Sequence, residues 1–249
     1  MLVQQTREQL QQLKLLGMAV MYDEQRANVD LQSLAFDERF GMLVESEKND
    51  RAKRRFERRL RAAKLKVQAW PEDVEYGAHR GLDRAVFTHL LTCDWIRNSL
   101  CTLITGPTGV GKTWLGCALG FQAIRKEFSV AYQRVPRLLE QLEIAYADGT
   151  LGKFRSRLAK TDLIILDDWG LSPMSTRGRA ELLELIDDHA DHGSILITSQ
   201  LPVAQWHDYI GEPTIADAIL DRLVSRSHHI QLRGDSMRKL QKPTVEGES

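Results

Sequence analysis

The stretch LCTLITGPTGVGKTWLGCALG at residues 100–120 constrains the fold of this chain more than any other feature. Its apolar start at 100–105 predicts a buried strand, and 113–126 has the character of a helix. The glycine-rich turn between them matches G-x-x-x-x-G-K-[ST], and this pattern predicts a phosphate-binding loop when a strand precedes it and a helix follows. A strand-to-helix turn without a ligand is the less favoured alternative. The defining positions of the pattern are Gly106, Gly111, Lys112 and Thr113.

A loop of this kind binds phosphate with its backbone. Glycines let successive N–H groups point inward, and the start of the following helix adds a partial positive charge. Lys112 is expected to reach the β- and γ-phosphates of ATP, and the Thr113 hydroxyl is expected to sit on Mg²⁺. The residues expected to contact the nucleotide here are Gly106, Pro107, Thr108, Gly109, Val110, Gly111, Lys112 and Thr113.

The stretch TDLIILDDWG supplies a second half for this site. Its apolar residues predict a buried strand at 162–167, with Asp167 and Asp168 at the strand end. Two neighbouring carboxylates are costly there unless a cation or water occupies them. Asp167 suits the Mg²⁺ shell, and Asp168 suits the polarisation of an attacking water. A strand that ends in a solvated turn is the alternative.

The next strand, SILITSQLP, ends in Thr198, Ser199 and Gln200. One of these could orient the water or bind the γ-phosphate, and we favour Gln200 over Ser199. Ordinary capping of the following helix is the alternative.

Late arginines are candidates for further phosphate contacts. In AILDRLVSRS, Arg222 and Arg226 lie one helical turn apart, where like charges repel unless an anion is near. Each could instead neutralise a neighbouring carboxylate. Arg238, in RGDSMRK, is either a phosphate contact or a surface charge.

A strongly basic helix is predicted at residues 51–66. Phe56, Leu60, Ala63 and Val67 form an apolar stripe, so the opposite face can turn its charges outward. Such a face suits the phosphate backbone of DNA or RNA, although a merely solvated face is the alternative. A second, weaker basic set comprises Arg137, Lys153, Arg155, Arg157 and Lys160. The candidate DNA-binding residues of the basic helix are Arg51, Lys53, Arg54, Arg55, Arg58, Arg59, Arg61, Lys64 and Lys66.

The chain divides into two parts of different texture, with an expected boundary near residue 70. Residues 1–68 contain no proline, and their apolar residues recur at helical spacing, which predicts a small helical domain over 1–70. From residue 100 onward, strands and helices alternate, which predicts an α/β domain over 71–249 with a parallel sheet covered on both faces. Ligands bind such sheets at the carboxyl ends of the strands. The expected strands are 100–105, 129–134, 162–167, 194–199 and 228–233.

Composition narrows the setting. The 34 basic and 34 acidic residues cancel, so affinity for a polyanion must come from how the charges are distributed. No apolar run approaches the roughly 20 residues of a membrane span, and the amino terminus lacks a signal-peptide core. Cys93, Cys101 and Cys117 show no C-x-x-C spacing and are expected to be reduced core thiols. We therefore expect a cytoplasmic protein with no membrane partner.

The order of these motifs resembles the AAA+ ATPases of the initiator and helicase-loader group, most closely the IstB-type transposition helper proteins and their DnaC-like relatives. The resemblance covers almost the whole chain. It implies a Walker A motif at Gly106 to Thr113 and a Walker B motif at Asp167 and Asp168. It further implies sensor one near Gln200, an arginine finger at Arg222 and sensor two at Arg238. Relatives usually carry Asp-Glu in Walker B and Ser-Asn at sensor one, where this chain has Asp-Asp and Ser-Gln.

The resemblance implies a self-assembling ATPase that binds ATP and Mg²⁺ between subunits, holds duplex DNA without base specificity and hands it to a transposase. A replicative helicase loader would share the ATPase core and differ in its partner. The presence of Asp168 in place of the usual glutamate favours another alternative, a DNA-binding protein that uses ATP only for assembly. A metabolite kinase would explain the phosphate loop but neither the basic helix nor the Arg222 and Arg226 pair.

Overall fold

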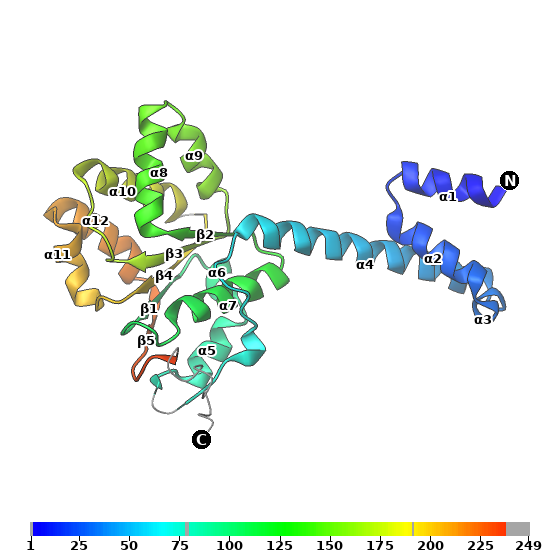
Figure 1. Cartoon of the computed structure of the whole chain (residues 1–249), viewed down its shortest axis with the longest axis horizontal. Coiled ribbons are helices and arrows are strands. Elements are labelled where there is room, and N and C mark those ends of the chain that lie inside the picture. Colours follow the sequence, from blue (N-terminus) through cyan, green and yellow to red (C-terminus); the bar gives the residue numbers. More distant parts are fainter. Residues whose placement is uncertain (1, 78–79, 191, 238–249) are drawn as a thin grey trace, which may run out of the picture. The chain divides into compact units, whose positions relative to one another are not determined.

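The computed structural model describes residues 2–77, 80–190 and 192–237. The chain forms two compact units, Met1–Arg59 and Leu60–Ser249. Figure 1 shows a unit made of helices alone and a unit in which helices surround a sheet. The helical amino-terminal part and the α/β part are therefore both present, as the sequence predicts.

The division between the units falls about ten residues before the expected boundary near 70, inside the long helix α4 (Phe36–Ala63). The segment after α4 packs on the α/β unit. A Cδ atom of Leu65 lies 3.2 Å from the position that a Cβ on Gly120 would occupy. The Trp70 ring meets the Phe121 ring edge-on at a centroid distance of 4.5 Å. These apolar contacts join the segment to the α/β unit, which is why the division falls before residue 70.

The α/β unit is built on five parallel strands in the order β2-β3-β4-β1-β5. The sequence predicts each strand to within about two residues. Because the strands are parallel, their carboxyl ends lie at the same end of the sheet. The phosphate-loop strand β1 pairs with β4, and β4 pairs with β3, so the carboxyl ends of these three strands lie close together. The strands are β1 (Cys101–Thr105), β2 (Val130–Arg134), β3 (Leu163–Trp169), β4 (Ser194–Ser199) and β5 (Ser227–Gln231).

Helices cover both faces of this sheet (Figure 1). A short 3-10 turn, η1, spans Pro71–Asp73, and another, η3, spans Val203–Gln205 just before α11. The helices of the unit are α5 (Arg84–Leu90), α6 (Asp94–Arg97), α7 (Lys112–Arg125), α8 (Val135–Ala147), α9 (Leu151–Ala159), α10 (Thr176–Ala190), α11 (Trp206–Ile210) and α12 (Pro213–Val224).

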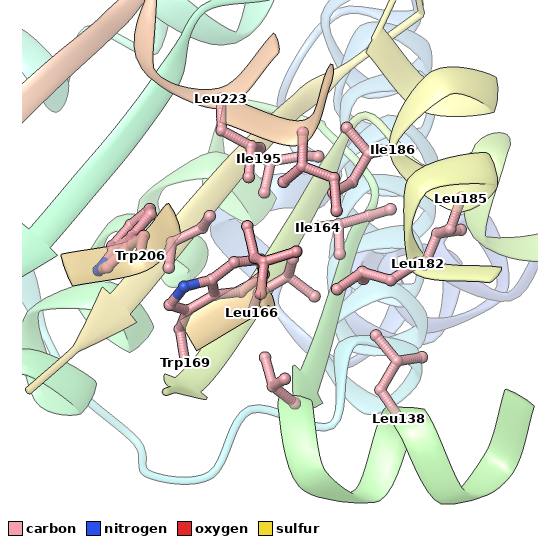
Figure 2. Packing of buried hydrophobic residues seen from close by; sticks show 14 of the residues in the cluster. Leu138, Ile164, Leu166, Trp169, Leu182, Leu185, Ile186, Ile195, Trp206 and Leu223 are labelled. Carbon is pink, nitrogen blue, oxygen red and sulfur yellow. The ribbon is translucent and has the colours of Figure 1, made fainter. Parts of the chain in front are cut away.

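The side chains of β3 show how the two faces are filled. Ile164 and Leu166 point to the face covered by α8, α10 and α12, where a continuous core includes Trp169 and Trp206 (Figure 2). Ile165 points to the other face, where Gly116 lets α7 approach closely. This alternation buries both faces of β3, which explains why its residues 163–166 are all apolar. The three cysteines of this unit are buried and free, as predicted, and burial raises the pKa of the Cys93 thiol to about 11.

A register shift lies at the end of β3. Leu166 pairs with Ile197 and Trp169 with Ser199, so Asp167 and Asp168 stand opposite a single residue of β4. This is a bulge with one extra residue, a feature that re-aims side chains at a strand end. The strand runs two residues beyond its predicted end, and Asp168 adopts a positive φ of 62° within it.

The helical unit contains α1 (Leu2–Gln12), α2 (Leu16–Ala27), α3 (Val29–Gln32) and the first part of α4. A polar contact joins α2 to α4: the buried Glu47 carboxylate accepts from the N–H groups of Gly17 and Met18 at 2.8 and 3.3 Å. Several apolar residues of these helices and their connections stay exposed in the described part of the chain, among them Leu13 at 68% and Phe36 at 72%.

In the described part of the chain, no helix is both long enough and apolar enough to cross a membrane.

Candidate nucleotide site

The phosphate loop joins β1 to α7 in a conformation that depends on glycine. Gly106, Gly109 and Gly111 have φ values of 147°, 84° and 94°. A Cβ on Gly106 would lie 2.5 Å from the carbonyl oxygen of Leu232, so backbone conformation and space both require glycine there. Gly111 caps the N-terminus of α7, and Lys112 is the first residue of the helix.

Lys112 is held inside its own loop. Its Nζ donates to the carbonyl oxygens of Gly106 and Pro107, each at 2.7 Å, and the residue is only 9% exposed. These bonds fix the ammonium at the mouth of the loop, beside the helix N-terminus, where a phosphate would be attracted.

Asp167 is the most enclosed member of the site. It is fully buried beneath the cavity, and its Oδ1 accepts from the Thr113 hydroxyl at 2.7 Å and from the Thr198 hydroxyl. Its Oδ2 accepts from the Tyr132 hydroxyl, and Lys66 Nζ lies 3.5 Å from the same atom. Burial acts to raise the pKa of Asp167, but the three hydroxyl donors outweigh it, so the pKa of this carboxyl lies below its usual value. The side chain is therefore an anion.

Asp168 faces the cavity instead. Arg134 Nε donates to its Oδ2 at 2.8 Å, and Lys66 Nζ lies 4.0 Å from that atom. The hydrogen bond to Asp168 raises the pKa of Arg134. The bulge thus sends the two adjacent carboxylates in different directions, one under the cavity and one into it.

A cavity of about 630 Å³ opens over this edge of the sheet, a size that suits a nucleotide. Lys112, Thr113 and Asp168 line it together with Gln200, which is exposed. The side-chain oxygens of Thr113 and Asp167 meet at its floor. Mg²⁺ prefers oxygen ligands and usually keeps several of its waters. The chain therefore has the donor set for Mg²⁺, with Asp167 able to act through a water because it does not itself line the cavity.

Three residues that no sequence motif assigns to the nucleotide site belong to it. Tyr132 and Lys66 contact Asp167, and the buried Arg80 donates to the carbonyl oxygens of Glu75 and Val110 at 2.7 and 3.0 Å, which braces the loop. The sequence places Lys66 only on the DNA-binding helix. The contact of Tyr132 with Asp167 could be predicted only once β2 was known to pair with β3. No local sequence pattern marks Arg80 or Lys66 as part of the site.

Two of the predicted late arginines, Arg222 and Arg226, lie outside this cavity of their own chain. Arg222 forms a two-pronged ion pair with Asp187 on α10, including an Nη2 to Oδ2 distance of 3.2 Å. Arg226 is exposed. Neither residue lines the cavity. Arg238 lies outside the described residues, one position after Met237, whose N–H donates to the Gly109 carbonyl oxygen at 3.0 Å.

The basic helix residues have two kinds of surroundings. Near its start, Arg51 pairs with Glu47 at 2.7 Å and Arg54 with Asp50 at 2.6 Å. The other exposed basic residues are Lys53, Arg55, Arg58 and Arg61 on α4 and Lys64 and Lys66 beyond it, because α4 ends at Ala63 and not at residue 66 as predicted.

The parallel sheet, the phosphate loop and the paired carboxylates define a P-loop protein of the AAA+ class. Solved structures with this fold include DnaI (TM-score 0.58, 19% identity, covering 66% of this chain and 91% of that one). Another is the replication initiator DnaA bound to AMPPCP and single-stranded DNA (TM-score 0.55, 19% identity, covering 69% and 52%).

The chain belongs to the family of IstB-like ATP binding proteins, whose sequence model matches residues 8–245. It is 48% identical over 242 residues to an insertion sequence ATP-binding protein, y4pL, of Sinorhizobium fredii, covering 97% of this chain and 99% of that protein. It is 49% identical over 203 residues to the insertion sequence IS1162 ATP-binding protein of Pseudomonas fluorescens, covering 81% and 88%. The resemblance found in the sequence is confirmed, and ATP binding is the activity that these names share.

Proposed function

We propose that this chain is an ATP-hydrolysing, DNA-binding assembly factor that assists the transposase of an insertion sequence. The observation that carries the enzymatic part is the 2.7 Å contact between Thr113 and Asp167 beneath a cavity that also presents Lys112 and Asp168. A phosphate loop alone binds nucleotide, whereas a second carboxylate facing the same cavity provides a group that can polarise water. The names of the relatives support the setting in an insertion sequence.

The proposed roles follow from the positions. Lys112 exchanges its two carbonyl acceptors for the β- and γ-phosphate oxygens of ATP. Thr113 and Asp167 would hold Mg²⁺, which would supply positive charge beside the transferred phosphate. Asp168 leaves Arg134 and orients the attacking water, and Gln200 lies at the cavity rim, where it can contact the γ-phosphate.

Replacement of Lys112 by alanine is expected to weaken ATP binding by about 100-fold, since it removes charge-assisted hydrogen bonds worth about 1.5–3 kcal/mol each. Equilibrium binding of ATP should show this loss while the melting temperature stays close to that of the parent. Lys126→Ala, an exposed change at the other end of α7, serves as the matched control. Unchanged affinity in Lys112→Ala would refute the role.

One specific observation favours a second candidate, in which ATP serves only for assembly. Asp168 is tied to Arg134 at 2.8 Å and is one methylene shorter than the glutamate usual in relatives of this type. An ATPase assay with and without duplex DNA separates the candidates. Turnover that DNA changes supports the proposed factor, and binding without turnover supports the assembly-only protein.

DNA binding is assigned to the exposed face of α4. Changing Lys53, Arg58 and Arg61 together to alanine is expected to weaken binding to all duplex sequences alike, because these side chains would bind backbone phosphates. The slope of log affinity against log salt should fall by about 0.9 for each phosphate that is no longer neutralised, or by about 2.7 if all three side chains bind phosphate.

The matched control for this triple variant removes the same charge from α9 and its end, with Lys153, Arg157 and Lys160 changed to alanine. Its salt slope should equal that of the parent. If instead the control lowers the slope and the α4 variant does not, DNA lies on the second basic set.

The partner distinguishes the proposed helper from a helicase loader. With the transposase encoded by the same insertion sequence, ATP-dependent stimulation of strand transfer into duplex DNA is expected. A loader would instead stimulate the loading of a replicative helicase and leave strand transfer unchanged.

A further inference from the structure

Lys66 is fixed beside the nucleotide site by the segment that contains it. It lies three residues after the end of α4, and its neighbours Leu65 and Trp70 pack against α7 at Gly120 and Phe121. The α7 helix also carries Lys112 and Thr113 at its start. The position of Lys66 is therefore set by the same helix that sets the phosphate loop.

The ammonium of Lys66 serves both carboxylates of the site. Its Nζ lies 3.5 Å from Asp167 Oδ2 and 4.0 Å from Asp168 Oδ2. The hydroxyl groups around Asp167 donate hydrogen bonds but carry no positive charge. Lys66 is 39% exposed at its side chain and lines the cavity, so it can leave this position without unpacking the core.

We propose that Lys66 is the internal counter-ion of Asp167 and, beside Arg134, of Asp168 in the nucleotide-free protein, and that Mg²⁺ arriving with the nucleotide displaces Lys66. Two cations at the same carboxylates repel each other, and Mg²⁺ additionally requires its own octahedral shell of oxygen ligands. Lys66 would then set how strongly nucleotide binding depends on Mg²⁺. This inference rests on the proposed role of Asp167 in holding the metal.

Removal of the Lys66 charge should have opposite effects on nucleotide affinity in the absence and in the presence of Mg²⁺. Without Mg²⁺, the polyanionic nucleotide would face carboxylates that have lost a neutralising charge, so binding should weaken. With Mg²⁺, no ammonium has to be displaced, so binding should tighten. A lysine that acted as a phosphate ligand would behave differently, because its loss would weaken binding in both conditions.

The test uses the full chain with Lys66→Met and the non-hydrolysable nucleotide AMPPCP. The dissociation constant is measured in EDTA and in excess Mg²⁺. The ratio of the EDTA value to the Mg²⁺ value is then compared with the same ratio for the parent. We expect the ratio to rise at least tenfold, and Mg²⁺ alone to raise the melting temperature of Lys66→Met more than that of the parent. Lys66→Arg, which keeps the charge, should retain most of the parent ratio, and Lys126→Met should leave it unchanged.

An unchanged ratio in a folded Lys66→Met protein would overturn the proposal, and so would equal weakening in both conditions. Lys66→Gln provides a polar second variant if the melting curve shows that Lys66→Met does not fold, and the same ratio decides. If the parent itself binds no nucleotide in either condition, the proposed function fails instead. The two failures are thus distinguishable.

Discussion

Arg222→Ala is expected to lower the rate of ATP hydrolysis by about 10³-fold or more while ATP binding is retained, because an arginine that stabilises the transferred phosphate contributes about 10³–10⁵ in rate. Arg222 does not line the cavity of its own chain. We therefore propose that it acts in trans, on ATP held by a neighbouring subunit.

The ion pair between Arg222 and Asp187 supplies the control for this experiment. The two side chains are 35% and 39% exposed, and an exposed pair of this kind contributes about 0–1 kcal/mol to stability. Asp187→Ala breaks the same pair but keeps the arginine. It should hydrolyse ATP at close to the parent rate, and an equal loss in both variants would assign Arg222 a structural role only.

Mixing two inactive variants tests whether Arg222 acts across an interface. At ATP concentrations too low to fill the Lys112→Ala site, whose affinity is about 100-fold weaker, that variant is inactive, and Arg222→Ala cannot complete the site of its neighbour. In an equal mixture with head-to-tail interfaces, roughly a quarter of interfaces would join an intact Lys112 to an intact Arg222. Activity should return in that mixture. If both variants assemble together on DNA and no activity returns, Arg222 does not act in trans.

Asp168→Asn is expected to bind ATP and Mg²⁺ but to hydrolyse ATP about 10²–10⁴-fold more slowly, the contribution typical of a side chain that activates a nucleophile by accepting its proton. The amide is nearly isosteric with the carboxylate but cannot accept a proton, and the buried Asp167 is untouched. A long-lived complex with ATP on DNA should result.

Nucleotide binding, turnover and dissociation from DNA are measured together for this variant. Arg134→Gln is an informative companion, because it breaks the contact with Asp168 and keeps the carboxylate. It should retain turnover if Asp168 must leave Arg134 to act. Hydrolysis at the parent rate in Asp168→Asn would refute the role of Asp168.

The predicted strands and helices of the α/β unit are confirmed because each depends on a local pattern. Solid apolar runs identify strands buried on both faces, and glycine spacing identifies the phosphate loop. The helical unit shows the limit of such patterns. Its periodicity predicts helices correctly, but Leu13 and Phe36 remain exposed, and Glu47 joins two helices through polar contacts instead. Periodicity reveals which side of a helix is apolar and not what covers it.

The contiguous parts of the site can be predicted from the sequence: the loop from Gly106 to Thr113 and the adjacent carboxylates Asp167 and Asp168. The side chains that surround them depend on how the whole unit packs. The strand order brings Tyr132 on β2 and Thr198 on β4 to either side of Asp167, and the packing of the segment after α4 on α7 brings Lys66 to both carboxylates. Motif residues a few positions apart are fixed by local backbone geometry. Lys66 and Asp167 are 101 positions apart, and such contacts depend on the packing of the whole sheet and its helices.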